Sequence, residues 1–179
     1  FARLIDQGHE VHVAYQTSGN IAVTDEEALK FIEVAENSFL KNQGNTDQLE
    51  GLKKSFNSDS IEISKDVLSV KAAVRRSECL AAARFLKLPT EQLHFLNLPF
   101  YETGKIIKNE PSAVDFKITQ DLIDEIKPHQ IFAAGDLADP HGTHRACLNI
   151  IFKVIEDIKA KAYMDDCRVW LYRGAWQEW

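Results

Sequence analysis

The sequence predicts an α/β protein, a three-layer sandwich built on a mostly parallel, Rossmann-like sheet. Short apolar or alternating runs at residues 10–15, 92–98, 130–134 and 167–172 are typical of strands. Stretches with the apolar spacing of helices lie between these runs. Strands that alternate with helices favour a parallel sheet covered on both faces. In such sheets ligands bind beyond the carboxyl ends of the strands.

The first segment predicts a helix that ends at Gly8. Phe1, Leu4 and Ile5 have the i, i+3, i+4 spacing of a helix face, and glycine is a natural C-terminal cap. The strand at 10–15 follows directly. We therefore expect the first strand of the fold to be missing, so that residues 1–179 form a single domain truncated at its N-terminus.

The next segments predict two helices separated by a polar stretch. Thr24 followed by three acidic residues predicts the start of a helix over 24–39. Residues 42–60 lack such a pattern, and we expect a solvated, partly helical excursion; the alternative is a lid over the active site. A helix over 71–86 follows, and its candidate core residues are Ala72, Leu80, Ala83 and Phe85.

The remaining segments complete the alternation. A helix over 118–126 ends before Pro128, and a second helix runs over 144–160. The loops that follow the predicted strands should meet at one edge of the sheet. These loops are 16–20, 99–104, 135–143 and 173–176.

Composition excludes several classes of function. The net charge is −6 and no Lys/Arg cluster is present, so we expect no nucleic-acid partner. Three separated cysteines argue against a disulfide framework and a thiolate zinc site. No apolar run approaches the ~18 residues of a membrane span, so we expect a soluble, cytoplasmic protein. The lack of a glycine-rich phosphate loop argues against a generic nucleotide-binding domain.

The loop 135–143 and the residue after it carry the densest set of reactive side chains. Asp136, Asp139, His141 and His144 follow a buried strand and precede a helix. Histidines three residues apart at a helix start can point into one cavity, one as a zinc ligand and one as an acid or oxyanion donor. The alternative is that these side chains only cap the helix and satisfy a polar loop.

Four stretches, at residues 2–19, 74–86, 93–101 and 139–146, resemble the PIG-L/LmbE-like family of zinc-dependent N-acetylglucosaminyl deacetylases. The last of them reads D-P-H-G-T-H-R-A. The resemblance implies removal of the acetyl group from an N-acetylated amino sugar, with or without a phosphate. It implies that His144 is a Zn²⁺ ligand and that His141 stabilises the tetrahedral intermediate or protonates the leaving amine.

The resemblance also implies a substrate-binding role for Arg75, which opens an Arg-x-x-Glu pattern with Glu78. Thr143 departs from the family, which usually has an aspartate there to orient the catalytic histidine. We expect Asp139, or else Asp136, to take over that supporting role. We therefore assign Asp139 to the catalytic set together with His141.

A second departure is the family's His-Pro-Asp-Asp segment, which would precede Phe1. In the family this segment supplies a His and an Asp to zinc and a second Asp as general base. We expect this chain by itself to hold little zinc and to release no acetate, while the complete protein is a metal-dependent N-deacetylase.

The sequence at residues 16–29 and 171–179 also resembles the deacetylase-like half of bacterial proteins whose other half is a glucosamine-6-phosphate deaminase. This implies a small-molecule amino-sugar substrate and leaves room for a fused deaminase domain and a homo-oligomer. The alternative is a non-catalytic sugar-binding or regulatory domain attached to such a deaminase, which Thr143 favours. His12 and His94 are interpreted as sheet residues.

Overall fold

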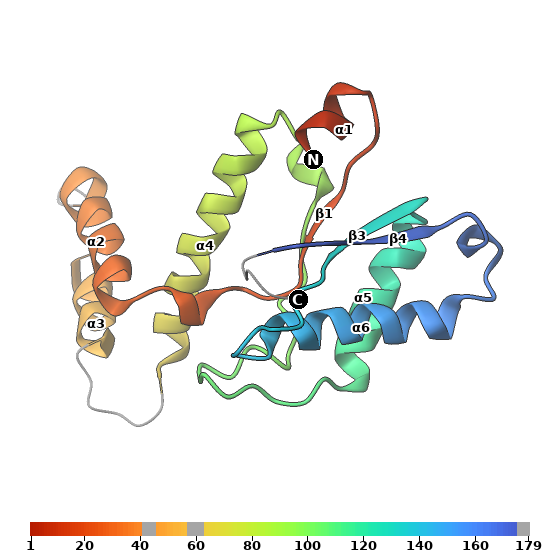
Figure 1. Ribbon diagram of the computed structural model, residues 1–179. Helices are drawn as coiled ribbons and strands as arrows, with labels where there is room; N and C mark the ends of the chain where they lie inside the picture. The colour runs from red at the N-terminus through yellow and green to blue at the C-terminus, as the bar shows by residue number, and fades with distance from the viewer. Residues whose placement is uncertain (41–45, 57–62, 175–179) are drawn as a thin grey trace. The chain divides into compact units, whose positions relative to one another are not determined.

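The structure is a computed structural model that describes residues 1–40, 46–56 and 63–174 (Figure 1). The chain divides into two compact units, residues 1–94 and residues 95–179. Each unit is described by itself.

The first unit is mostly helical. Its elements are α1 (Ala2–Asp6), β1 (Val13–Tyr15), the 3₁₀ turn η1 (Asn20–Ala22), α2 (Asp25–Ala35), the π-helical turn η2 (Glu36–Leu40), α3 (Thr46–Phe56), α4 (Lys65–Phe85), the 3₁₀ turn η3 (Thr90–Gln92) and β2 (Leu93–Phe95). Thr24 caps α2 by accepting the Glu27 N–H at 3.1 Å. Ser64 caps α4 in the same way.

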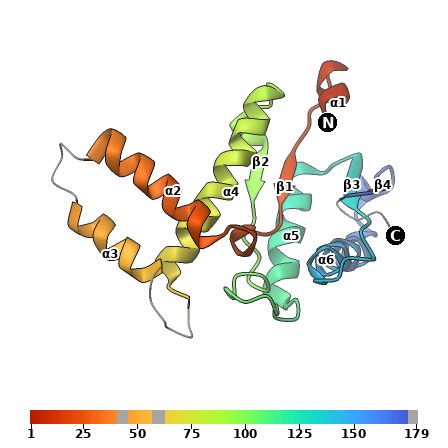
Figure 2. The ribbon, with the colours of Figure 1, turned by 60° about the vertical axis from the view of Figure 1, so that its left-hand side comes forward.

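Helices α2 and α3 contact each other and both contact α4 (Figure 2). The apolar cluster between them centres on Val23, Ala28 and Val74. The nearly buried Lys71 reaches Asp25 at 2.7 Å and so ties α4 to the start of α2. Strands β1 and β2 pair as a two-stranded sheet. This arrangement fixes the position of the loop after β1 relative to α4.

The second unit contains α5 (Ala113–Ile126), β3 (Gln130–Ala134), α6 (Thr143–Ile158), the 3₁₀ turn η4 (Ala162–Met164) and β4 (Arg168–Tyr172). Strands β3 and β4 are parallel. Helix α6 packs on α5 and on β3. Its buried residues are Leu148, Ile150, Val154 and Ile158, and the last three repeat at the four-residue spacing of a helix face.

The loop before α5 is anchored by a buried aspartate. Asp115 is fully buried, and its carboxylate accepts the Phe100 N–H at 2.9 Å and the Ser112 N–H at 2.7 Å. Burial by itself would raise the pKa of Asp115, but these donated hydrogen bonds outweigh it and lower that pKa below its ordinary value. Because Ser112 and Asp115 form a capping box, α5 begins at Ala113 rather than at the predicted residue 118.

The predicted element order is confirmed, with corrections at several boundaries. Strand 130–134 has the predicted bounds, whereas α2 ends at Ala35, before the predicted residue 39, and α4 begins at Lys65, before the predicted residue 71. The prediction that Phe85 is buried is wrong, since it is 87% exposed at the last turn of α4. Part of the predicted excursion is the helix α3, and the rest lies outside the described residues.

The described strands pair as β1–β2 and β3–β4. The chain is therefore α/β, while the three-layer sandwich and the single domain stay predictions. Within the described residues, no helix combines the length and the apolar character needed to cross a membrane.

Candidate active site

The register of β3 and β4 places Asp136 beside Gly174. Ala134 and Tyr172, the last residues of β3 and β4, are partners in the parallel pair. Asp136 and Gly174 each lie two residues beyond the end of their strand. The Gly174 N–H donates to Asp136 Oδ1 at 2.8 Å. The segments after these two strands therefore meet at the same edge at Asp136 and Gly174, as the sequence predicted, while residues 175 and 176 lie outside the described residues. That loops 16–20 and 99–104 share this edge stays a prediction.

Gly174 leaves no room for a side chain at this point. A Cβ atom built on Gly174 would lie 2.3 Å from Asp136 Oδ2 and 3.0 Å from its Cγ. Asp136 itself is 2% exposed. The carboxylate is thus held in one orientation by close packing and by a backbone hydrogen bond.

Asp136 in turn orients the imidazole of His144. Asp136 Oδ2 lies 2.8 Å from His144 Nδ1, and because a carboxylate only accepts, Nδ1 carries the proton. This leaves Nε2 as the ring nitrogen suited to a metal ion. The His144 side chain is 39% exposed while that of Asp136 is 1% exposed. A buried carboxylate behind a histidine is the usual support of a metal-ligating imidazole.

Asp139 holds the backbone of both histidines. Its Oδ1 accepts the His141 N–H at 2.9 Å, and its Oδ2 accepts the His144 N–H at 2.8 Å. Asp139 is buried, and the second of these bonds satisfies an unpaired N–H in the first turn of α6. The positive φ of Gly142, 72°, lets the chain turn between the two histidines into the helix. Asp139 therefore positions the backbone of the loop.

Burial, with a contribution from these carboxylates, raises the pKa of two neighbouring groups. Burial raises the pKa of the Cys147 thiol to about 12, with a smaller contribution from Asp139. Burial and then Asp136 raise the pKa of Tyr172. At neutral pH neither group is ionised, so Cys147 is better suited to packing as a small apolar residue than to acting as a nucleophile.

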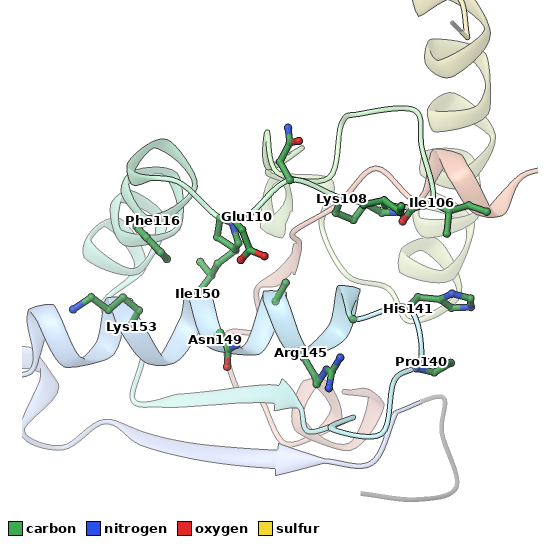
Figure 3. A pocket seen from close by; sticks show the side chains of 15 residues that line it. Ile106, Lys108, Glu110, Phe116, Pro140, His141, Arg145, Asn149, Ile150 and Lys153 are labelled. Carbon is green, nitrogen blue, oxygen red and sulfur yellow. The ribbon is translucent and has the colours of Figure 1, made fainter. Parts of the chain in front are cut away.

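A cavity of about 870 Å³ opens beside His141. Figure 3 shows loop residues Ile106, Lys108 and Glu110 on one side of it, α6 residues on the other, and His141 at one end. The remaining lining includes Phe116, Arg145, Asn149, Ile150 and Lys153. This volume lies within the usual range of small-molecule pockets.

Arg75 lies in the first unit, on α4, and its guanidinium pairs with Glu78 three residues along the helix. A Cβ atom built on Gly19 would lie 3.2 Å from Arg75 Cγ and 3.3 Å from its Nε. The stem of Arg75 thus packs against the backbone of the loop after β1. The Arg-x-x-Glu pattern forms an ion pair, and the role of Arg75 toward a substrate stays a prediction.

The predicted metal ligand His144 is an oriented histidine, and its role toward a metal stays a prediction. Over residues 1–40, 46–56 and 63–174, no three His, Cys, Asp or Glu side chains gather into a set that could hold a metal ion. His144, with Nδ1 bound to Asp136, has the chemistry of one zinc ligand.

Sequence reasoning missed two features. The contact of Gly174 with Asp136 depends on strand register, which the residue pattern alone does not specify. The pair of His12 and His94 was interpreted only as sheet residues, but His12 Nδ1 lies 2.9 Å from His94 Nε2 and the rings stack at 5.2 Å. This contact joins β1 to β2.

Comparison with known proteins places these observations in a family. The sequence pattern of PIG-L, described as GlcNAc-PI de-N-acetylase, matches residues 1–155. A glucosamine-6-phosphate deaminase-like protein of Bacteroides thetaiotaomicron is 47% identical over 189 residues, which cover 99% of this chain. The chain spans 28% of the length of that relative. No solved structure matches the chain.

Proposed function

This chain belongs to the PIG-L (GlcNAc-PI de-N-acetylase) family, and on that premise we propose that it forms part of a zinc-dependent hydrolase that removes the acetyl group from an N-acetylated amino sugar. The family supports a deacetylase-type hydrolase acting on GlcNAc-like substrates. The contact between Asp136 and His144 is the observation that carries the assignment of zinc to this loop.

The buried Asp136 accepts a hydrogen bond from the Nδ1–H of His144 and so leaves Nε2 available to a metal ion. When bound, a zinc ion polarises a carbonyl and lowers the pKa of a coordinated water. His141 lines the cavity and is our candidate for protonating the departing amine. Asp139 supports both histidines through their backbone N–H groups. Arg75 is our candidate for holding the substrate.

The name of the bacterial relative supports an amino-sugar context for this chain. We infer that the domain acts beside a glucosamine-6-phosphate deaminase domain, in a cytoplasmic protein. Removal of an acetyl group would produce a free amino sugar, which is the class of compound that such a deaminase consumes.

Two substitutions in the intact protein distinguish the proposed zinc-ligand role of His144 from the proposed general-acid role of His141. We expect His144→Ala to lower bound zinc, and His141→Ala to keep zinc while lowering acetate release by about 10²–10⁴-fold, the usual range for general acid–base catalysis. His129→Ala is a matched control, because His129 is an exposed histidine of the same unit. Bound zinc and acetate release from N-acetylglucosamine derivatives would be measured for each variant. Unchanged zinc and activity in both test variants would refute the assignment.

A non-catalytic sugar-binding or regulatory domain is the second candidate. Thr143 stands where the family usually has the aspartate that orients the catalytic histidine. Both oxygens of Asp139 accept backbone N–H groups, and the two oxygens of Asp136 accept the Gly174 N–H and the His144 Nδ1–H. Sugar binding without acetate release by the zinc-loaded intact protein would favour this candidate.

A further inference from the structure

The cavity beside His141 has more positive than negative side chains in its wall. Lys108, Arg145 and Lys153 line it, against one carboxylate from Glu110. The chain as a whole carries a formal net charge of −6. An excess of cations in the wall of a cavity, within an acidic protein, is an electrostatic feature suited to an anionic ligand.

The three cationic side chains differ in whether a carboxylate already neutralises their charge. The Lys153 ammonium lies 2.9 Å from Asp157 and 3.8 Å from Glu156, so its charge is already balanced on α6. In the described part of the chain, no carboxylate pairs with the exposed Arg145. Its guanidinium fork, in the first turn of α6, is suited to a planar or tetrahedral oxyanion.

Lys108 supplies charge from the opposite wall. Its Nζ donates to the carbonyl oxygens of Lys105 at 2.9 Å and Ile106 at 2.7 Å, and it lies 4.9 Å from the centre of the Tyr101 ring. These contacts fix the ammonium, and among the described residues no carboxylate is in direct contact with it. Burial lowers the pKa of Lys108, and the Asp139 carboxylate opposes that shift.

We propose that this cavity binds the phosphate group of a phosphorylated N-acetylated amino sugar, with Arg145 and Lys108 as its anion-binding residues. The same cavity also has apolar residues in its wall, on which a sugar ring can pack: Ile106, Phe116 and Ile150. Since His141 lies at one end of the cavity (Figure 3), a phosphate bound here belongs to the molecule whose acetamide meets that histidine. The inference rests on the proposed deacetylase function.

The test compares phosphorylated and neutral sugars on the intact, zinc-loaded protein. The kcat/KM for acetate release is measured with N-acetylglucosamine 6-phosphate and with N-acetylglucosamine. Calorimetry measures binding of glucose 6-phosphate, glucose and inorganic phosphate, none of which can be deacetylated. We expect at least a tenfold preference for the phosphorylated substrate, and tighter binding of glucose 6-phosphate than of either partial ligand.

Arg145→Gln should weaken glucose 6-phosphate binding by about tenfold to a hundredfold, as expected for loss of a charge-assisted hydrogen-bonding group. Lys108→Gln should weaken it in the same direction, and Arg145→Lys should restore part of the affinity. Lys159→Gln is the control, since it removes one positive charge from the far end of α6, about 20 Å from Arg145 along the helix. We expect that control to leave binding unchanged.

The outcomes separate the inference from the proposed function. Equal affinity for glucose 6-phosphate in the wild type and Arg145→Gln would overturn the inference, as would binding of inorganic phosphate as tightly as the sugar phosphate. Deacetylation without any preference for the phosphorylated substrate would also overturn it while leaving the proposed function intact. Binding of glucose 6-phosphate that depends on Arg145, without acetate release, would support the phosphate site and contradict the deacetylase function.

Discussion

Gly174→Ala should disrupt the support of His144 although the added group is a single methyl. The new Cβ would lie 2.3 Å from Asp136 Oδ2 and 3.1 Å from Oδ1. Ordinary contact begins at about 3.4 Å, so the carboxylate must move by roughly 1 Å. Asp136 is buried and packed on the backbone at this point, so it has little space in which to move.

The magnitude follows from the hydrogen bonds that such a movement breaks. Asp136 accepts the Gly174 N–H and the His144 Nδ1–H, each at 2.8 Å. A hydrogen bond to a charged group contributes about 1.5–3 kcal/mol, and overpacking costs about 1–3 kcal/mol. We expect a loss of about 2–4 kcal/mol in the free energy of unfolding. Loss of the carboxylate behind a metal-ligating histidine should also weaken zinc binding by about tenfold to a hundredfold.

The assay is thermal unfolding of the intact protein, together with zinc affinity measured by competition with a chelator. Gly51→Ala is the matched control, because a Cβ there meets no atom within 4 Å. Since Gly51 lies inside α3, alanine there should stabilise slightly, by up to about 1 kcal/mol. If Gly174→Ala leaves both stability and zinc affinity at the level of the wild type, the account of Asp136 as a fixed support for His144 is wrong.

Two further predictions concern buried and paired carboxylates of the second unit. Asp115→Asn should lower the free energy of unfolding by about 2–4 kcal/mol, because the amide oxygen can still accept the Phe100 N–H but the NH2 group cannot accept the Ser112 N–H and hydroxyl that now donate to Oδ2. Urea unfolding at pH 7 measures this, and an unchanged midpoint would contradict it. Hydrogen bonds from Lys161 and Tyr163 lower the pKa of Asp124 to about 2. The stability that the ionised Asp124 contributes is therefore fully present above its unfolded pKa of about 4, and it is lost as pH falls through about 2. Asp124→Asn should therefore reduce the pH dependence of stability between about pH 4 and pH 2, and identical acid-unfolding profiles for the wild type and the variant would refute the assignment.

The sequence predicted the elements best where local signals agreed. The run at 130–134 lies between Pro128 and Gly135, and its bounds were correct. The start of α5 was placed late because the reciprocal cap of Ser112 and Asp115 precedes the apolar pattern. Phe85 was expected in the core because apolar type suggests burial, but it lies on the exposed side of the last turn of α4. The pairing of strands into one sheet is a long-range property, and local periodicity does not determine it.

The candidate site was located by sequence, but its internal contacts were not. The D-x-x-D-x-H-x-x-H spacing placed four polar side chains between a strand and a helix. Which carboxylate faces which histidine depends on the turn at Gly142 and on β4, which is distant in sequence. The structure pairs Asp136 with the His144 ring, while Asp139 holds the backbone of His141 and His144. The expected support of the His141 ring by one of these aspartates stays a prediction.

The most direct test of the proposed deacetylase function is the yield of acetate and free amine from N-acetylglucosamine 6-phosphate. Both products would be quantified with the intact protein as purified, after treatment with a chelator, and after zinc is restored. We predict that acetate equals the sum of the free amino sugar and the ammonia that a deaminase domain would release from it, that acetate is lost on chelation, and that it recovers with zinc. Binding of the sugar without formation of either product, or acetate release that is unaffected by chelation, would contradict zinc-dependent deacetylation at this site.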